Sequence, residues 1–402
     1  MDVVVQDWRR TACRHLIRSV RPRLVLLSLI TMLVCGVSRA TVVTPSGDDE
    51  VIEVLPAPSG NRVEERQLRQ RLAADPQDAP SAVALARRYL AQAHAQGDPR
   101  FAGRAFAALQ AWPDPASAPD EVLMALATLQ QYLHDFDTSV ASLERLVKRR
   151  PQHAQAWLTL ATVRRVQGRY ADSDRACEGL LATGASLYAR ACQAENDSLR
   201  GEYERTRASI AALLATPRLP AETRNWLLTT LAESEARAGL AKQAEIAYRQ
   251  ALEAQPDAYT TMSYADFLLE RQRPGDALAQ LRGQPRTDAV LLRLAIAGEQ
   301  SGSPHALSDA AEMKDRMAMA NLRPEARTTH ARELAMFALW IDKTPSKALN
   351  LARENVKHQR EPLDLLVLAQ AAAASRNPTA LREADVLRKS MDLHDKRLDA
   401  LL

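Results

Sequence analysis

The chain has 402 residues, of which 46% are hydrophobic and 4% aromatic, and it contains 14 glycines. A chain of this length can bury a large core, so it needs neither a metal ion nor dense disulfides in order to fold. Its net charge of +4 arises in the segment 1–40, which holds seven arginines and two aspartates; the rest carries 46 basic and 47 acidic side chains. A nearly neutral chain gives no argument for a polyanionic partner, so we expect it to bind no nucleic acid.

Residues 1–40 are built like a secretory signal peptide. An arginine-rich segment over 1–23 is followed by an uncharged apolar run over 24–37, and Ser38 and Ala40 are small residues at the usual positions before a cleavage site at Thr41. A membrane-spanning helix needs about 20 apolar residues, which is more than this run offers. We therefore expect export, with cleavage after Ala40, into a periplasm. The alternative is an uncleaved leader that anchors the protein in the inner membrane.

Residues 41–61 form a polar segment that contains Pro56 and Pro58. Because proline cannot continue a helix or donate to a strand ladder, this segment is expected to be an extended tether. The short apolar run 51–55 is alternatively a docking strand that adds to the sheet of a partner. Helical periodicity then starts near Val63, and from residue 80 onward it is typical of a helical hairpin.

The strongest pattern is a spacing of 34 between residues 120 and 184. Seven positions recur at this spacing with the same residue class. They are Leu123, Leu126, Ala127, Phe136, Ser139, Leu143 and Leu146, followed by Trp157, Leu160, Ala161, Tyr170, Ser173, Cys177 and Leu180. A period of 34 built from two amphipathic helices is the signature of a helical solenoid, in which each hairpin buries its apolar faces against its neighbours.

This pattern resembles the tetratricopeptide repeat (TPR) family, and the resemblance covers residues 79–302 well. It implies an all-α fold: a right-handed α-solenoid of TPR-like helical hairpins with divergent terminal repeats. The expected division of the chain follows from it. It runs from a signal peptide (1–40) and an extended tether (41–61) to an N-terminal capping helix with a divergent repeat (62–118), the TPR array (119–302), and degenerate helical repeats with a C-terminal cap (303–402).

TPR proteins usually hold their ligands in a concave groove lined by the first helix of each hairpin, so the resemblance implies a protein or peptide partner. The groove positions carried over are Met124, Thr128 and Gln131; Leu158, Thr162 and Arg165; Ala191, Glu195 and Ser198; Thr229, Glu233 and Ala236; Met262, Asp266 and Leu269. Seven of them are the expected partner-binding residues, namely Thr128, Gln131, Thr162, Arg165, Glu195, Glu233 and Asp266.

The groove positions depart from the family's carboxylate clamp, which needs Lys and Asn where this chain has Thr, Glu and Asp. An acidic C-terminal tail is therefore not the expected ligand. Glu195, Glu233 and Asp266 occupy one equivalent position in successive repeats, and we expect them to form an acidic row that prefers a basic or mixed peptide. The alternative is that these carboxylates are ordinary solvated helix surface.

Two cysteines remain once residues 1–40 are removed. Cys177 lies on the second helix of one repeat, at the position that faces the next unit, and Cys192 lies on the first helix of that unit. We predict a disulfide between them, which would stabilise the fold by about 3 kcal/mol. The alternative is a pair of buried thiols that act as small apolar side chains.

The chain contains no nucleophile elbow, phosphate loop, zinc-protease helix or haem attachment motif. Met313, Met317 and Met319, with His305 and His330 nearby, resemble a soft-metal site, but their helical spacing favours a packing role. We expect no metal, no cofactor and no small-molecule substrate. The sequence predicts a non-enzymatic exported scaffold or adaptor, with envelope complex assembly as a candidate role. The alternatives are a membrane-anchored assembly factor that keeps its leader, and an enzyme with a site in residues 303–402.

Overall fold

The computed structural model describes residues 60–98, 100–320 and 331–402. Every regular element in these ranges is an α-helix, as expected for an all-α protein. The predicted signal peptide, the run 51–55 and nearly all of the predicted tether lie outside the described residues. The first described helix, α2 (Gly60–Ala74), begins slightly before the predicted start of the capping helix at Arg62.

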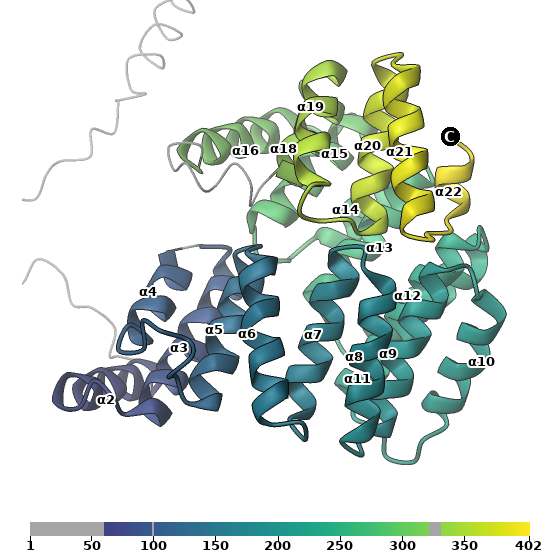
Figure 1. Ribbon diagram of the computed structural model, residues 1–402. Helices are drawn as coiled ribbons and strands as arrows, with labels where there is room; N and C mark the ends of the chain where they lie inside the picture. The colour runs from purple at the N-terminus through teal and green to yellow at the C-terminus, as the bar shows by residue number, and fades with distance from the viewer. Residues whose placement is uncertain (1–59, 99, 321–330) are drawn as a thin grey trace, which may run out of the picture. The chain divides into compact units, whose positions relative to one another are not determined.

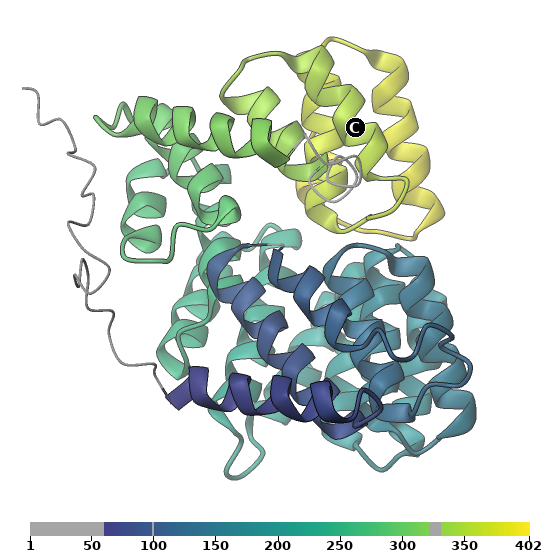
Figure 2. The same ribbon diagram turned by 90° about the vertical axis from the view of Figure 1, so that its left-hand side faces the viewer.

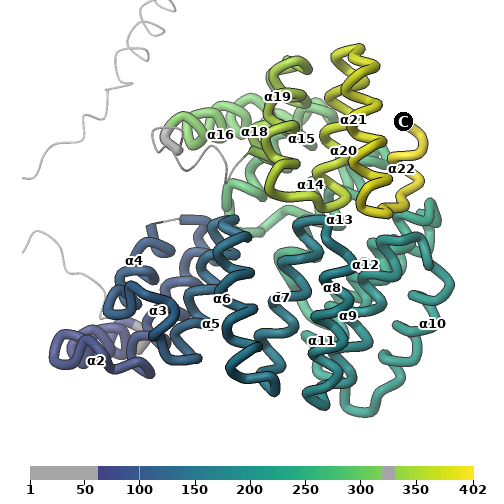
Figure 3. The backbone as a smooth tube through the Cα atoms, in the orientation of Figure 1, coloured from purple at the N-terminus to yellow at the C-terminus, as the bar shows by residue number. Residues whose placement is uncertain are grey.

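Successive helices then pair as hairpins (Figures 1 and 3). The first helices are α3 (Ala79–Gln96), α5 (Asp120–Tyr132), α7 (Ala154–Val166), α9 (Ser186–Leu199), α11 (Ala221–Arg237), α13 (Ala258–Glu270), α15 (Asp288–Ser301), α18 (Ala331–Trp340) and α20 (Pro362–Ala374). The second helices are α4 (Arg100–Ala108), α6 (Phe136–Arg149), α8 (Tyr170–Ala182), α10 (Tyr203–Leu214), α12 (Ala241–Ala254), α14 (Pro274–Leu281), α16 (Ala306–Ala320), α19 (Pro345–Asn355) and α21 (Pro378–Ser390). A short helix, α22 (Lys396–Asp399), ends the array.

A small buried residue on the first helix of each regular hairpin lets the second helix approach closely. In the α5–α6 hairpin, the hydroxyl of Ser139 donates to the backbone carbonyl of Ala127 over 2.8 Å. The same bond joins Ser173 to Ala161 over 2.9 Å in the next hairpin. The repeat spacing of 34 therefore places a side-chain hydrogen bond, as well as apolar contacts, at the centre of each regular hairpin.

The predicted disulfide is present. Cys177 on α8 and Cys192 on α9 are bonded, with their Cα atoms 5.8 Å apart, and both are buried. Next to the disulfide, the buried amide of Asn196 donates to the hydroxyl of Ser173 and the carboxylate of Asp174, over 3.0 and 2.8 Å. The buried polar side chain of Asn196 is thus satisfied by hydrogen bonds to α8.

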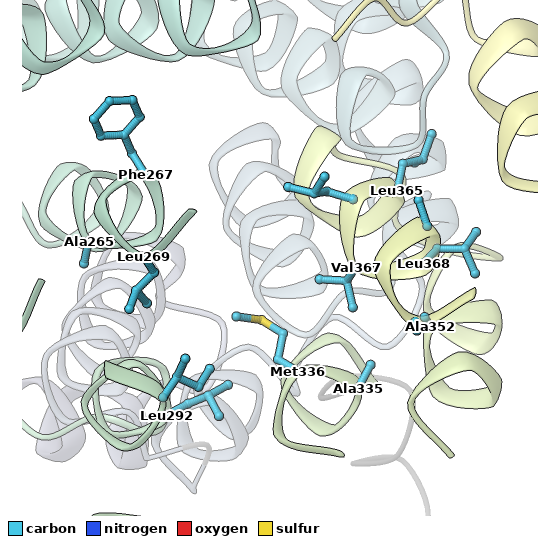
Figure 4. Close-up of a cluster of buried hydrophobic side chains, with 14 of the residues drawn as sticks. Ala265, Phe267, Leu269, Leu292, Ala335, Met336, Ala352, Leu365, Val367 and Leu368 are labelled. Carbon is cyan, nitrogen blue, oxygen red and sulfur yellow. The ribbon is translucent and has the colours of Figure 1, made fainter. Parts of the chain in front are cut away.

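The array continues past Gly302. This glycine ends α15, which pairs with α16, so the predicted boundary at 302 falls inside one hairpin. The helix α20 is buried on every side, with Leu365, Leu366, Val367 and Leu368 all in the core. Figure 4 shows Leu269 of α13, Leu292 of α15, Met336 of α18 and Val367 of α20 around a common centre of this cluster. A helix that is apolar all round is an interior helix, so residues 303–402 contribute an interior helix to the largest core.

Within residues 60–402, the later hairpins stack on the earlier ones in two tiers (Figures 1 and 2). The backbone N–H of Arg360 donates to the carbonyl of Val166 over 2.7 Å, and that of His394 donates to the carbonyl of Leu199 over 2.8 Å. Val166 and Leu199 are the last residues of α7 and α9. Carbonyls at a helix end lack a partner within the helix, so the second tier satisfies acceptors that the first tier leaves open.

A glycine at the tier contact provides a test of this stacking. Gly201 has φ +82°, and a Cβ there would lie 2.9 Å from Cβ of His394, whereas Gly184 has φ +85° with open space around it. We expect Gly184→Ala to cost about 1 kcal/mol through backbone strain alone. Gly201→Ala should cost at least about 1 kcal/mol more, because His394 must also move. Urea unfolding of both variants measures the difference, and equal losses would contradict the tier contact.

Candidate functional site

The seven predicted partner-binding residues lie on consecutive first helices, α5, α7, α9, α11 and α13, each of which contacts the next. All seven are half-buried. Other carried-over positions are core instead, because neighbouring first helices pack closely there. The buried ones are Met124, Ala191, Ser198, Thr229, Ala236 and Leu269. Leu158 and Met262 are half-buried apolar residues.

Two threonines occupy the α5–α7 part of this surface. The hydroxyl of Thr128 donates to the carbonyl of Met124 over 2.9 Å, and that of Thr162 donates to the carbonyl of Leu158 over 3.0 Å. Each hydroxyl donates its proton to a carbonyl one turn earlier in its own helix, so the proton is already used within the helix. The charged side chains among the seven residues are Arg165 on α7 and the carboxylates on α9, α11 and α13.

The three carboxylates of the predicted acidic row differ in their partners. Glu195 forms an ion pair with Arg165. Asp266 accepts two bonds from Arg293, over 2.8 and 2.6 Å. Glu233 has no ion pair among the described residues. Two of the three charges in the acidic row are thus neutralised within the chain.

Glu233 is held by hydroxyl groups. It accepts hydrogen bonds from Tyr259 over 2.8 Å and from Ser263 over 2.9 Å. Burial raises the pKa of Glu233, while the charge of Arg237 and these two hydrogen bonds act in the opposite direction. The charge of Glu233 in turn raises the pKa of Tyr259 well above its usual value, so the tyrosine remains a donor.

A row of aromatic side chains runs beside the acidic row, and the sequence analysis missed it. Tyr188, Trp226 and Tyr259 each stand two helical turns before the carboxylate on their own helix, on α9, α11 and α13. Because of this spacing, each aromatic ring lies on the same face as its carboxylate. Applying the repeat register to this position would have identified the row.

The aromatic row is partly open to solvent and is joined to the acidic row. Tyr188 is 41% exposed and Tyr259 is 56% exposed. Tyr188 stacks on Trp226 with ring centroids 6.2 Å apart. The indole N–H of Trp226 donates to Glu195 over 2.9 Å, just as Tyr259 donates to Glu233. Each of these bonds connects one first helix to the preceding one, which fixes the rings in place.

A separate pocket of about 510 Å³ lies where the two tiers meet. It is lined by Leu133, His134, Asp135, Phe136, Asp137, Gln167, Arg169, Asn355, Lys357, His358, Gln359 and Arg360. Its two carboxylates serve local structure, since Asp135 caps α6 and Asp137 accepts a bond from Gln167 over 2.8 Å. The lining contains no hydroxyl or thiol side chain that a neighbouring base would activate.

The methionines of the expected soft-metal alternative are packing residues where the structure describes them. Met313 is buried in the largest core cluster, and Met317 packs against that cluster. The side chain of Met319, and His330, lie outside the described residues. The described residues hold no group of three or more His, Cys, Asp or Glu side chains arranged to bind a metal ion. In the same residues, no helix has the length and apolar character required to cross a bilayer.

Comparison with known proteins finds similarity among solved structures alone. No protein-family model matches it, and no curated protein does. Among solved structures, a tetratricopeptide repeat protein from Parabacteroides merdae is 15% identical, with a TM-score of 0.47 over 58% of this chain and 90% of that one. PilW, described as a widely conserved type IV pilus biogenesis factor, is 20% identical, with a TM-score of 0.31 over 54% and 97%. The chain's own hairpins form an all-α, TPR-like solenoid.

The pairing of Asp266 with Arg293 provides a test of this contact between α13 and α15. Arg293 is 8% and Asp266 15% exposed, so Arg293→Met should leave a carboxylate without its partner and cost about 3 kcal/mol or more. As a control, Arg175→Met removes a partner of Asp172 that is 70% exposed, and should cost less than about 1 kcal/mol. Chemical denaturation compares the two variants. A loss at Arg293 no larger than that at Arg175 would contradict the buried pair.

Proposed function

We propose that the protein is an exported, non-enzymatic scaffold that binds a protein or peptide partner in the groove formed by α5, α7, α9, α11 and α13, in the assembly of an envelope complex. The observation that carries the proposal is the partly exposed aromatic row on the face that also holds the acidic row. Exposed aromatic side chains gathered on one face are typical of binding surfaces, because they contribute a large contact area with little loss of conformational entropy.

The groove residues are positioned before a partner arrives. Trp226 and Tyr259 are each tied to a carboxylate on the preceding helix, over 2.9 and 2.8 Å. Side chains that are already ordered lose less entropy on binding, which favours affinity. Thr128, Gln131 and Thr162 extend the surface toward the N-terminal end, where their half-buried side chains give a partner further contacts.

Export is supported by the leader and by the disulfide. Residues 1–40 have the three parts of a signal peptide, and a Cys177–Cys192 bond persists best in an oxidising compartment. We expect the protein recovered from cells to begin at Thr41. Mass spectrometry of the N-terminus measures this, and an intact leader on the recovered protein would favour the membrane-anchored alternative instead.

Site-specific crosslinking in cells tests the groove itself. A photoreactive amino acid is placed at Tyr188 or Thr162, in the groove, and at Leu307, which is exposed on α16. The groove positions should each yield one discrete adduct with the same partner, identified by mass spectrometry, while Leu307 should not yield it. Adducts that form equally at Leu307, or only there, would place the binding surface elsewhere.

A further inference from the structure

The half-buried carboxylate of Glu233 is the one member of the acidic row whose charge has no ion pair among the described residues. Glu195 is paired with Arg165, and Asp266 with Arg293. The partners of Glu233 are the neutral hydroxyl groups of Tyr259 and Ser263, which satisfy hydrogen bonds but leave the charge in place. A desolvated carboxylate of this kind gains the most from a cation that is brought by a ligand.

The charges that surround Glu233 and Tyr259 are mixed. Arg237 favours the charged form of Glu233; it is buried, donates to the neutral hydroxyl of Ser198, and has no ion pair of its own among the described residues. Glu195 acts on Glu233 with a like charge, and Glu361, at the start of α20, acts on Tyr259 in the same sense as Glu233. Glu195 and Glu361 are each paired with an arginine, Arg165 and Arg332. Of Glu233 and Arg237, the two charges here without an ion pair among the described residues, Arg237 is buried, so the charge that this part of the surface presents to a ligand is the half-buried carboxylate of Glu233.

The ring of Tyr259 offers an open aromatic surface beside that charge. Its hydroxyl is fixed on Glu233, while the residue as a whole is 56% exposed. A cation over an aromatic face is attracted by the ring quadrupole. Arginine suits this arrangement better than lysine, because its planar guanidinium can stack on a ring and bind a carboxylate with two donors at once.

We propose that the groove selects an extended partner segment carrying an arginine, whose guanidinium stacks on Tyr259 and pairs with Glu233. This inference rests on the proposed function and specifies its ligand chemistry. The stacked pair of Tyr188 and Trp226, on the two preceding first helices, then contacts apolar or aromatic side chains of the same segment. Acidic segments are excluded, because they would bring like charge to Glu233.

The test uses a phage-displayed library of random dodecapeptides, panned against the purified protein and against its Glu233→Gln variant. Glutamine keeps the shape of the side chain and an acceptor for Tyr259, so the substitution removes the charge alone. The wild type should enrich peptides with an arginine at one fixed position, and the variant should not enrich arginine. Glu253→Gln, on α12 and away from the first helices, is the matched control and should select the same peptides as the wild type.

The affinity of the best selected peptide then measures the contact. Replacing its arginine by glutamine should weaken binding to the wild type roughly tenfold or more, which corresponds to about 1.4 kcal/mol. The same replacement should have little effect on binding to Glu233→Gln, and Tyr259→Leu should reduce the preference for arginine over lysine. Circular dichroism and the thermal midpoint confirm that each variant is folded.

Two different results would overturn the inference. If peptides are selected in the groove but show no arginine preference, or keep that preference in Glu233→Gln, the arginine subsite is wrong and the proposed scaffold function stands. If no peptide is enriched on the wild type over a variant with Tyr188, Trp226 and Tyr259 all changed to alanine, the groove is not a peptide-binding surface. That outcome overturns the proposed function together with the subsite.

Discussion

The close approach of two helices at one small residue is the contact on which the whole array depends. At Ala127 and Ala161 the second helix comes near enough for a serine hydroxyl to reach the backbone carbonyl of the first. A larger side chain at either position would push the helices apart and break that hydrogen bond as well as the apolar packing. Because each hairpin presents its outer faces to the next one, an error at this contact would propagate along the solenoid.

The stacking of the tiers follows from the same geometry. Hairpins of nearly constant length place their turns at regular intervals along one edge of the array. Two backbone hydrogen bonds lie on this edge, from Arg360 to Val166 and from His394 to Leu199. The two donors are one repeat apart in the chain, and the two acceptors are almost one repeat apart. One repeat of the second tier therefore matches one repeat of the first, and the ion pair of Arg397 with Glu270 continues the contact toward the C-terminal end.

Sequence reasoning predicted the parts of this protein that depend on local periodicity. The helices, their pairing and the Cys177–Cys192 disulfide follow from residue classes that recur within one or two repeats. The tiers were not predicted, because Arg360 and Val166 are far apart in the chain and no pattern connects them. Residues 303–402 were expected to form degenerate repeats, so α20 was not recognised as an interior helix. Its sequence nevertheless lacks a polar face, which is typical of an interior helix. The aromatic row was missed because only the family's usual groove positions were carried over.

The repeat register also explains why Glu233 alone lacks an ion pair in the described part of the acidic row. Residues that stand two positions before the buried alanines Ala232, Ala265 and Ala295 contact the carboxylate of the preceding helix. They are Thr230, Ser263 and Arg293, which donate to Glu195, Glu233 and Asp266. Glu195 also pairs with Arg165, which lies on the preceding first helix. The equivalent residue on the first helix before Glu233 is Ser198.

An arginine reaches Glu195 from one of these two positions and reaches Asp266 from the other. At Glu233, both positions hold a serine. The solenoid builds the same carboxylate three times and forms an ion pair with an arginine at two of them. The third carboxylate adjoins the more exposed of the two exposed rings, Tyr259. Ion pairs at all three carboxylates would serve to join consecutive first helices to each other. The absence of an ion pair at Glu233 among the described residues is the feature on which the proposed selectivity for a cation from outside the chain rests.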